Sequence, residues 1–137
     1  ASERLHAAGL CHGDIRNDHL YVDETSGAYR WIDFDLDQGE PLFDVLSAGN
    51  VLHFVVARGF LSFRDAMGRE PALADRLAET DGSVFFPHRV MNLRAVYPYV
   101  PERLNAVLLR FSGGAGSCYA SMRSLADDLE HCLEVLA

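Results

Sequence analysis

Lysine is absent from the sequence: all twelve basic side chains are arginine, and they stand against twenty acidic side chains. The formal net charge is -8. Because phosphate backbones are bound by a concentrated basic face, this balance argues against nucleic acid as a partner. No apolar run approaches the roughly 20 residues that a membrane span needs, and the start shows no signal-peptide pattern. We therefore expect a cytoplasmic protein with no membrane span.

Cysteine is scarce as well. The three cysteines, Cys11, Cys118 and Cys132, are odd in number and form no C-x-x-C pair, so they suggest neither a disulfide framework nor a zinc knuckle. We expect buried thiols instead. The chain has 137 residues, of which 49% are hydrophobic, and this length is that of one domain with a core of its own.

Helical patterns dominate the chain. Residues 2–10 predict the end of a helix that stops at Gly9, and we expect that residues upstream of Ala1 are missing. Apolar residues on almost every side of 41–59 predict a helix that begins at Pro41 and is buried all round. Further helices are expected over 62–67, 71–79, 101–111 and 119–136. The last should bury one face, formed by Met122, Leu125, Leu129, Cys132, Leu133 and Leu136.

Two short segments rich in β-branched and aromatic residues, 19–23 and 29–33, flank a sequence typical of a turn. This pattern predicts a β-hairpin. A turn centred on Ser26 sets the first residue of one strand, His19, opposite the last residue of the other, Asp33. The polar stretch HGDIRNDH (12–19) and the acidic stretch DFD (33–35) are therefore expected to meet in space.

Three aspartates stand out in this arrangement: Asp14 precedes the hairpin, Asp33 closes it, and Asp44 opens the segment DVLSAG on the expected buried helix. Residues 3 to about 55 resemble the catalytic lobe of the protein-kinase-like superfamily, including its short bacterial branch of small-molecule and lipopolysaccharide kinases. HGDIRNDHLYVD resembles the catalytic loop and the strand after it, WIDFD the metal-binding segment, and DVLSAG the start of the central helix. The resemblance implies a mainly α C-terminal kinase lobe with one small β-hairpin over 1–137.

The family's roles, carried onto these positions, imply an ATP-dependent phosphotransferase. Asp14 is then the catalytic aspartate that orients or deprotonates the attacking hydroxyl, and Asp33 binds the Mg²⁺ that bridges the nucleotide phosphates. Arg16 stands where protein kinases commonly carry a lysine that steadies the γ-phosphate, and it could supply a local cation. An exposed arginine without a role is the equal alternative.

Three further residues have supporting roles in this resemblance. His12 resembles the structural histidine packed under the loop, and a buried Asp44 would hydrogen-bond the backbone of the catalytic loop. Tyr21 holds the strand position that usually forms the floor of the adenine pocket, with core packing as the alternative.

The sequence departs from the family at His19, where asparagine usually supplies a second metal ligand. Magnesium prefers oxygen, so imidazole puts this second ligand in doubt and favours Mn²⁺ or Zn²⁺. Asn17 and Asp18 lie one or two residues off the pattern, although either could be recruited. A catalytically impaired pseudokinase or nucleotide-binding scaffold is therefore the alternative to an active enzyme.

The missing lysine is a second departure, because the family anchors ATP with a lysine of the N-terminal lobe. We expect this lobe to be absent and the chain alone not to turn over ATP, with the missing lobe or self-association covering its cleft. Only eleven positions separate Asp33 from Asp44. This spacing leaves no room for a long activation segment and favours a small-molecule or constitutive kinase. The hydroxyl acceptor, whether protein, sugar or another metabolite, stays open.

Other sequence features offer weaker alternatives. Asp33, Asp35, Asp37 and Asp44 fall at positions 1, 3, 5 and 12 of an EF-hand-like calcium loop, but glutamine holds the sixth position, where glycine makes the turn. The glycine-rich stretch 112–117 follows a helix and lacks the Gly-Lys-Ser/Thr ending of a phosphate loop, so we expect a flexible connector. His53, on the apolar helix, is expected to be a satisfied core histidine.

Overall fold

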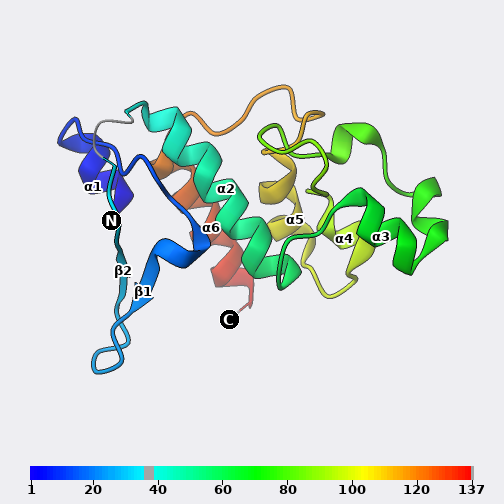
Figure 1. The fold of residues 1–137 in the computed structure, drawn as a ribbon, viewed down its shortest axis with the longest axis horizontal. Coiled ribbons are helices and arrows are strands. Elements are labelled where there is room, and N and C mark those ends of the chain that lie inside the picture. Colours follow the sequence, from blue (N-terminus) through cyan, green and yellow to red (C-terminus); the bar gives the residue numbers. More distant parts are fainter. Residues whose placement is uncertain (36–38, 137) are drawn as a thin grey trace.

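The computed structural model describes residues 1–35 and 39–136. The fold is mainly helical with one two-stranded antiparallel sheet among these residues, as the sequence predicts. Figure 1 shows the hairpin and the first short helix at the end that holds the N-terminus, the long helices 41–57 and 122–136 in the middle, and the helices within residues 63–109 at the other end. The elements are α1 Ser2–Ala7, β1 Leu20–Val22, β2 Tyr29–Trp31, α2 Pro41–Ala57, α3 Phe63–Arg69, α4 Leu93–Val96, α5 Glu102–Leu109 and α6 Met122–Leu136.

The hairpin forms, but its register is one residue tighter than predicted. Its pairs are Leu20↔Trp31, Tyr21↔Arg30 and Val22↔Tyr29. The cause is the side chain of Asp23, whose Oδ1 accepts the backbone N–H groups of Thr25 and Ser26, both at 3.0 Å. This Asx-type turn closes the loop early.

In this register the backbone N–H of Ile32, rather than that of Asp33, donates to the carbonyl oxygen of His19 at 2.9 Å. The predicted pairing of His19 with Asp33 is therefore wrong at the backbone. The two side chains nevertheless lie close together, since Asp33 follows Ile32 directly at the end of the strand.

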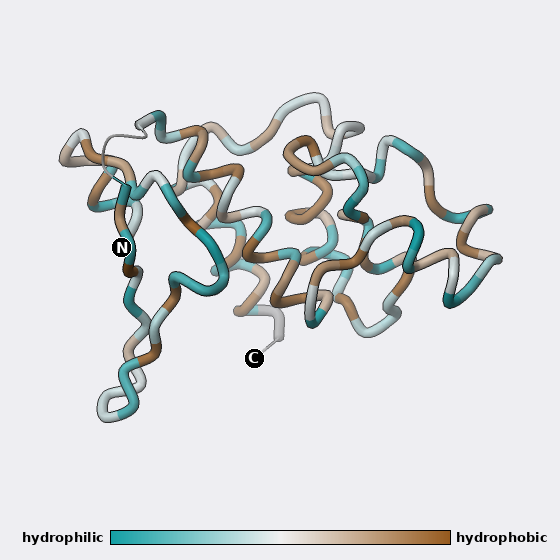
Figure 2. Tube along the Cα trace, in the orientation of Figure 1, coloured by the Kyte–Doolittle hydropathy of each residue, from teal (hydrophilic) through white to brown (hydrophobic). Residues whose placement is uncertain are grey.

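Helix α2 begins at Pro41 as predicted, and the left-handed residue after its end is Arg58, at φ 56°, followed by Gly59. The prediction that it is buried all round is wrong, because only one face packs against α5 and α6. Hydrophobic residues occur along much of the helix (Figure 2), yet Leu42, Phe43 and Val55 are exposed. The buried face is unusually polar or small; it consists of Asp44, Val45, Ser47, Gly49, His53 and Ala57.

The core lies between α2, α5, α6 and the loops that connect the shorter helices. Its largest fully buried apolar side chains include Leu61, Leu73, Met91, Leu93 and Leu108. Helix α1 packs against α6, and Gly9 after its end has the left-handed conformation expected of a stop. No helix in the described ranges is both long and apolar enough to cross a membrane.

Several local predictions need correction. Residues 71–79 form no α-helix: a 3₁₀ turn at Pro71–Asp75 and a second at Glu79–Asp81 replace it. In α6, Leu125 and Cys132 are buried, but the predicted core residue Leu133 is 65% exposed, because it lies about 100° round the helix from the buried Cys132. The short helix α4 was not predicted. The side chain of Leu136 lies outside the described residues.

The buried thiols agree with the sequence. Cys11 and Cys132 are buried and Cys118 is partly buried, and all three are free. His53 is a core histidine as predicted: it is fully buried, and its Nε2 accepts the backbone N–H of Leu61 at 3.0 Å. It is satisfied at one ring nitrogen only, since its buried Nδ1 has no hydrogen-bond partner among the described residues. Burial, together with the nearby charge of Arg89, lowers the pKa of His53 from 6.5 to about 4.

Candidate active site

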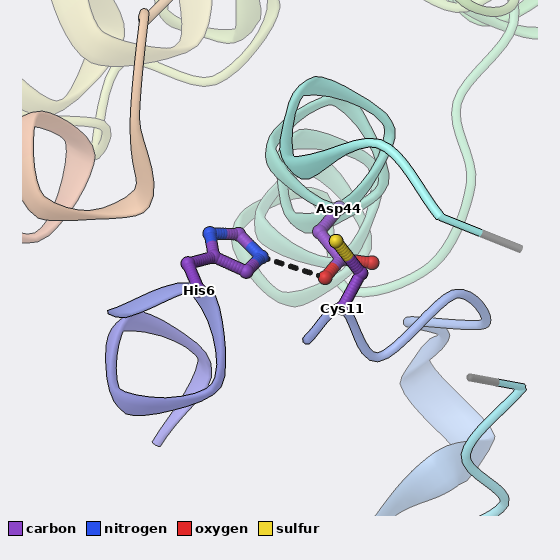
Figure 3. Close-up of side chains that lie close together, drawn as sticks. All are labelled: His6, Cys11 and Asp44. Atoms are coloured by element: carbon purple, nitrogen blue, oxygen red, sulfur yellow. Dashed lines mark hydrogen bonds and ion pairs between the residues drawn. The ribbon is translucent and has the colours of Figure 1, made fainter. Parts of the chain in front are cut away.

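Asp44 ties the polar loop to the core. Its side chain is fully buried in the first turn of α2, and its oxygens accept the backbone N–H groups of His12 at 2.7 Å and Gly13 at 2.9 Å. A third bond joins Oδ2 to Nε2 of His6 at 2.8 Å (Figure 3). The hydrogen bonds expected between Asp44 and the loop backbone are thus present. They compensate the cost of burying this carboxylate.

His12 lies under the loop, also fully buried. Its ring packs against Phe34, with centroids 4.3 Å apart, and edge-on against Trp31 at 5.7 Å. Its Nδ1 accepts the backbone N–H of Asp14 at 3.2 Å, and its own carbonyl accepts the N–H of Asp35 at 2.8 Å. His12 therefore joins the loop that carries Asp14 to the segment that follows β2.

His19 stands between the two aspartates of the predicted site. Its Nδ1 lies 3.4 Å from Oδ2 of Asp14, and its Nε2 lies 3.6 Å from Oδ2 of Asp33. The imidazole is largely buried, whereas the carboxylates of Asp14 and Asp33 are 41% and 69% exposed. The structure therefore brings all three residues to one place on the surface.

The hydrogen bonding of His19 fixes which nitrogen faces which partner. Nδ1 lies 2.9 Å from the backbone carbonyl oxygen of Asp14, which can only accept, so a neutral ring carries its proton on Nδ1. The lone pair of Nε2 then points toward Asp33. Asp33 itself has φ 55°, a left-handed conformation that non-glycine residues adopt rarely and often at functional sites.

His19 Nε2 and Asp33 Oδ2 offer two of the ligands that a divalent cation requires. Two donor atoms 3.6 Å apart can both reach one metal ion at ligand distances of about 2.0–2.2 Å. A nitrogen–oxygen pair suits Mn²⁺ or Zn²⁺ better than Mg²⁺, which prefers oxygen alone. Asp33 and His19 are therefore the residues that would hold a metal here.

Arg16 is paired with an acidic neighbour. Its Nε and its terminal nitrogen bind the two carboxylate oxygens of Asp18 at 3.1 and 2.8 Å, in a two-point contact on the surface. This contact raises the pKa of Arg16 and lowers that of Asp18. Asp18 thus engages Arg16 rather than the site between His19 and Asp33, and the charge of Arg16 is largely balanced.

Tyr21 lies on β1 with 51% of its surface exposed. The alternative that it packs in a core is therefore wrong. Its assignment to an adenine pocket stays a prediction.

A pocket of about 360 Å³ opens beside Asp14. Asp14, Arg16 and Asn17 of the polar loop line one side, and α2 lines another. The remaining walls come from parts of the chain that sequence reasoning left without a role; they are Phe60, Phe85, Phe86 and Arg89. No motif signals these residues, because they lie outside regular helices and strands, in segments that isolated β-bridges such as Ser62↔Arg89 and Gly82↔Val90 connect.

A group of side chains that could hold a metal ion lies at the end of α1: the ligand atoms of His6, Cys11 and Asp44 are within 4.8 Å of one another (Figure 3). Hydrogen bonds account for its geometry, since the Asp44 carboxylate is already bonded to His6 and to two backbone N–H groups. Burial and the nearby Asp44 raise the pKa of the Cys11 thiol, which disfavours the thiolate that a metal requires. We regard the cluster as an anchor for the loop.

The hydrogen bonds of Asp44 also argue against the calcium-loop alternative, in which Asp44 would be the ligand at position 12. The Asp44 carboxylate is fully buried and engaged with α1 and the loop, so it is not available to a calcium ion beside Asp33 and Asp35. Its fifth-position residue, Asp37, lies outside the described residues.

Comparison with protein families, curated proteins and solved structures found no match for this chain.

Proposed function

We propose that this protein is a kinase-like phosphotransferase that moves the γ-phosphoryl group of ATP to a hydroxyl group of a small molecule. The observation that carries the proposal is the placement of Asp14 and Asp33 on either side of His19, at 3.4 and 3.6 Å. Phosphoryl transfer depends on positioning and on charge neutralisation more than on covalent chemistry. Two separated carboxylates divide these tasks between them.

Asp14 faces the pocket, so its carboxylate is the group that orients and deprotonates the attacking hydroxyl. Asp44 and His12 act through the backbone: they fix the loop from both sides and thereby hold Asp14 at the rim of the pocket. Both are positioning residues. A concave site of this volume, with aromatic walls and a few polar groups, suits a small acceptor.

Asp33 and His19 would hold the divalent cation, which supplies charge neutralisation at the nucleotide phosphates when bound. Asp33 contributes a charged oxygen, and His19 contributes the Nε2 lone pair that its bond to the Asp14 carbonyl directs outward.

A nucleotide-binding protein without transfer activity is the second candidate. The observation that favours it is the imidazole at position 19, which sits against Asp14 as well as Asp33 and replaces the oxygen ligand that Mg²⁺ prefers. The exchange His19→Asn separates the two candidates. An active enzyme should use Mg²⁺ better after the exchange, whereas a scaffold should gain nucleotide affinity without gaining transfer.

The direct test is transfer of labelled phosphate from ATP, with Mn²⁺ or Mg²⁺, to a panel of hydroxyl compounds by the complete protein. Asp14→Asn should lower transfer about a hundredfold or more, the usual contribution of a positioned general base. The matched control is Asp75→Asn, an exposed carboxylate far along the chain, which should leave transfer unchanged. Equal transfer by the unaltered protein and Asp14→Asn would refute the proposal.

A further inference from the structure

Arg89 is the uncompensated charge of the pocket beside Asp14. Its guanidinium carbon lies 3.8 Å from the ring centroid of Phe60 and 4.0 Å from that of Phe86, so the cation is held between two aromatic faces. Its Nε is buried and has no hydrogen-bond partner among the residues that the structure describes. Within residues 1–35 and 39–136, no carboxylate lies within ion-pair distance of it.

The backbone around Arg89 is fixed from two sides. Its carbonyl accepts the N–H of Ser83 at 2.9 Å, its own N–H donates to Phe86 at 2.9 Å, and it forms an isolated bridge with Ser62. The hydroxyl of Ser83 in turn accepts the N–H groups of Phe85 and Phe86, each at 3.1 Å. The guanidinium and its aromatic walls are therefore placed in advance, which lowers the entropic cost of binding.

A buried donor without a partner costs free energy that a ligand can recover. Burial lowers the pKa of Arg89, which shows that its surroundings disfavour charge, yet an arginine side chain stays protonated in proteins. An anion that accepts from the guanidinium would supply both the missing hydrogen bonds and the missing counter-charge.

We propose that the acceptor is a small hydroxylated molecule that has an aromatic or apolar body and carries an anionic group, carboxylate or phosphate, which binds Arg89. The body packs against Phe43, Phe85 and Phe86, and the hydroxyl faces Asp14 across the pocket. Asn50, which also lines the pocket, offers an amide that can bind a further polar group. This inference rests on the proposed function only for the hydroxyl; the anion site stands on Arg89 itself.

Calorimetry or NMR titration without nucleotide tests the anion site. Phenyllactate combines an aromatic ring, a hydroxyl and a carboxylate, phenyllactamide is its neutral counterpart, and inorganic phosphate reports a bare anion. We expect phenyllactate to bind in the millimolar range and the amide at least about tenfold more weakly, because the charged hydrogen bond is lost. Equal affinities, or no detectable binding of phenyllactate, would overturn the inference.

Variants of Arg89 provide a second readout. Arg89→Gln should reduce phenyllactate affinity about tenfold and leave the amide unchanged, while Arg89→Lys, which keeps the charge but not the planar fork, should lose less. The control is Arg64→Gln, an exposed arginine of α3, which should bind phenyllactate as the unaltered protein does. If Arg89→Gln unfolds, the comparison of acid and amide in the unaltered protein still decides.

The two proposals fail separately. Binding of phenyllactate that depends on Arg89, without transfer to any hydroxyl compound, would retain the anion site and refute the phosphotransferase. Phosphoryl transfer that requires Asp14 but is equally fast to charged and neutral acceptors would refute the anion site alone. If phosphate binds and phenyllactate does not, the inference is overturned as well, because the site then takes an anion without the aromatic body.

Discussion

The two carboxylates of the candidate site belong to two regions that are built differently. Asp14 lies in a loop whose backbone is hydrogen-bonded to the fully buried Asp44. Asp33 follows a strand of the hairpin, whose side chains are open to solvent: Tyr21 is 51% and Tyr29 is 71% exposed. The loop depends on long-range hydrogen bonds to α2. The hairpin depends mainly on its own turn. His19, at the start of the hairpin, connects the two regions.

This difference explains which parts of the molecule the sequence could predict. The hairpin follows from local composition, and the buried role of Asp44 follows from a motif whose polar residue stands in an apolar helix. The predicted register was wrong by one residue, because hydrogen bonds to the Asp23 side chain, and not the backbone alone, shape the turn. Local signals suffice where local interactions dominate.

The pocket walls could not be predicted for the converse reason. Phe85, Phe86 and Arg89 show no helical or strand period, and the segment that carries them is held by isolated bridges such as Ser62↔Arg89 and Gly82↔Val90. Likewise, the sequence shows apolar residues on all sides of α2. Only the tertiary structure determines which of them are exposed, and that Phe43 faces the pocket. Contacts between distant segments carry information that single-sequence patterns lack.

The largest effect should come from breaking the anchor of the loop. Asp44→Ala removes an acceptor from two backbone N–H groups and from His6, and we expect a loss of about 3 to 5 kcal/mol in the free energy of unfolding. Urea unfolding followed by circular dichroism measures it. Asp44→Asn should lose less, and the exposed control Asp75→Ala should change stability by no more than about 0.5 kcal/mol. A small loss for Asp44→Ala would mean that the loop does not rely on this carboxylate.

Acid should destabilise the helical region through His53. Its pKa in the folded protein is about 4, against 6.5 when unfolded, so unfolding takes up a proton between these values. The stabilisation is complete above the unfolded value and is lost as the pH falls toward the folded one. We expect this group to lower the free energy of unfolding by about 2 kcal/mol between pH 7 and pH 5.

His53→Leu should flatten that part of the pH dependence of unfolding, measured with urea at several pH values. His131→Gln, at an exposed position of α6, should leave it unchanged. A pH dependence that survives in His53→Leu would assign the effect to other groups.

Acid should affect the hairpin less than the helical region, and only at its turn. Hydrogen bonds from the backbone of Ser26 and Thr25 lower the pKa of Asp23 from its ordinary value of 3.8. The turn is therefore stabilised above that value and weakened as the pH falls through the lower value of the folded state. In acid, the protection of the Thr25 and Ser26 amides, measured as hydrogen exchange relative to the intrinsic rate at the same pH, should fall, while amides in α5 keep their protection. Asp23→Asn should remove this pH dependence.

The central claim is that the region of Asp14 handles the acceptor and the region of Asp33 handles the metal and nucleotide. Calorimetric titration of the complete protein with ATP and Mn²⁺ tests it most directly. We expect Asp33→Ala to abolish metal-dependent nucleotide binding and Asp14→Asn to leave the affinity within about threefold of the unaltered protein. Equal losses in the two variants, or binding that persists in Asp33→Ala, would contradict the division of roles.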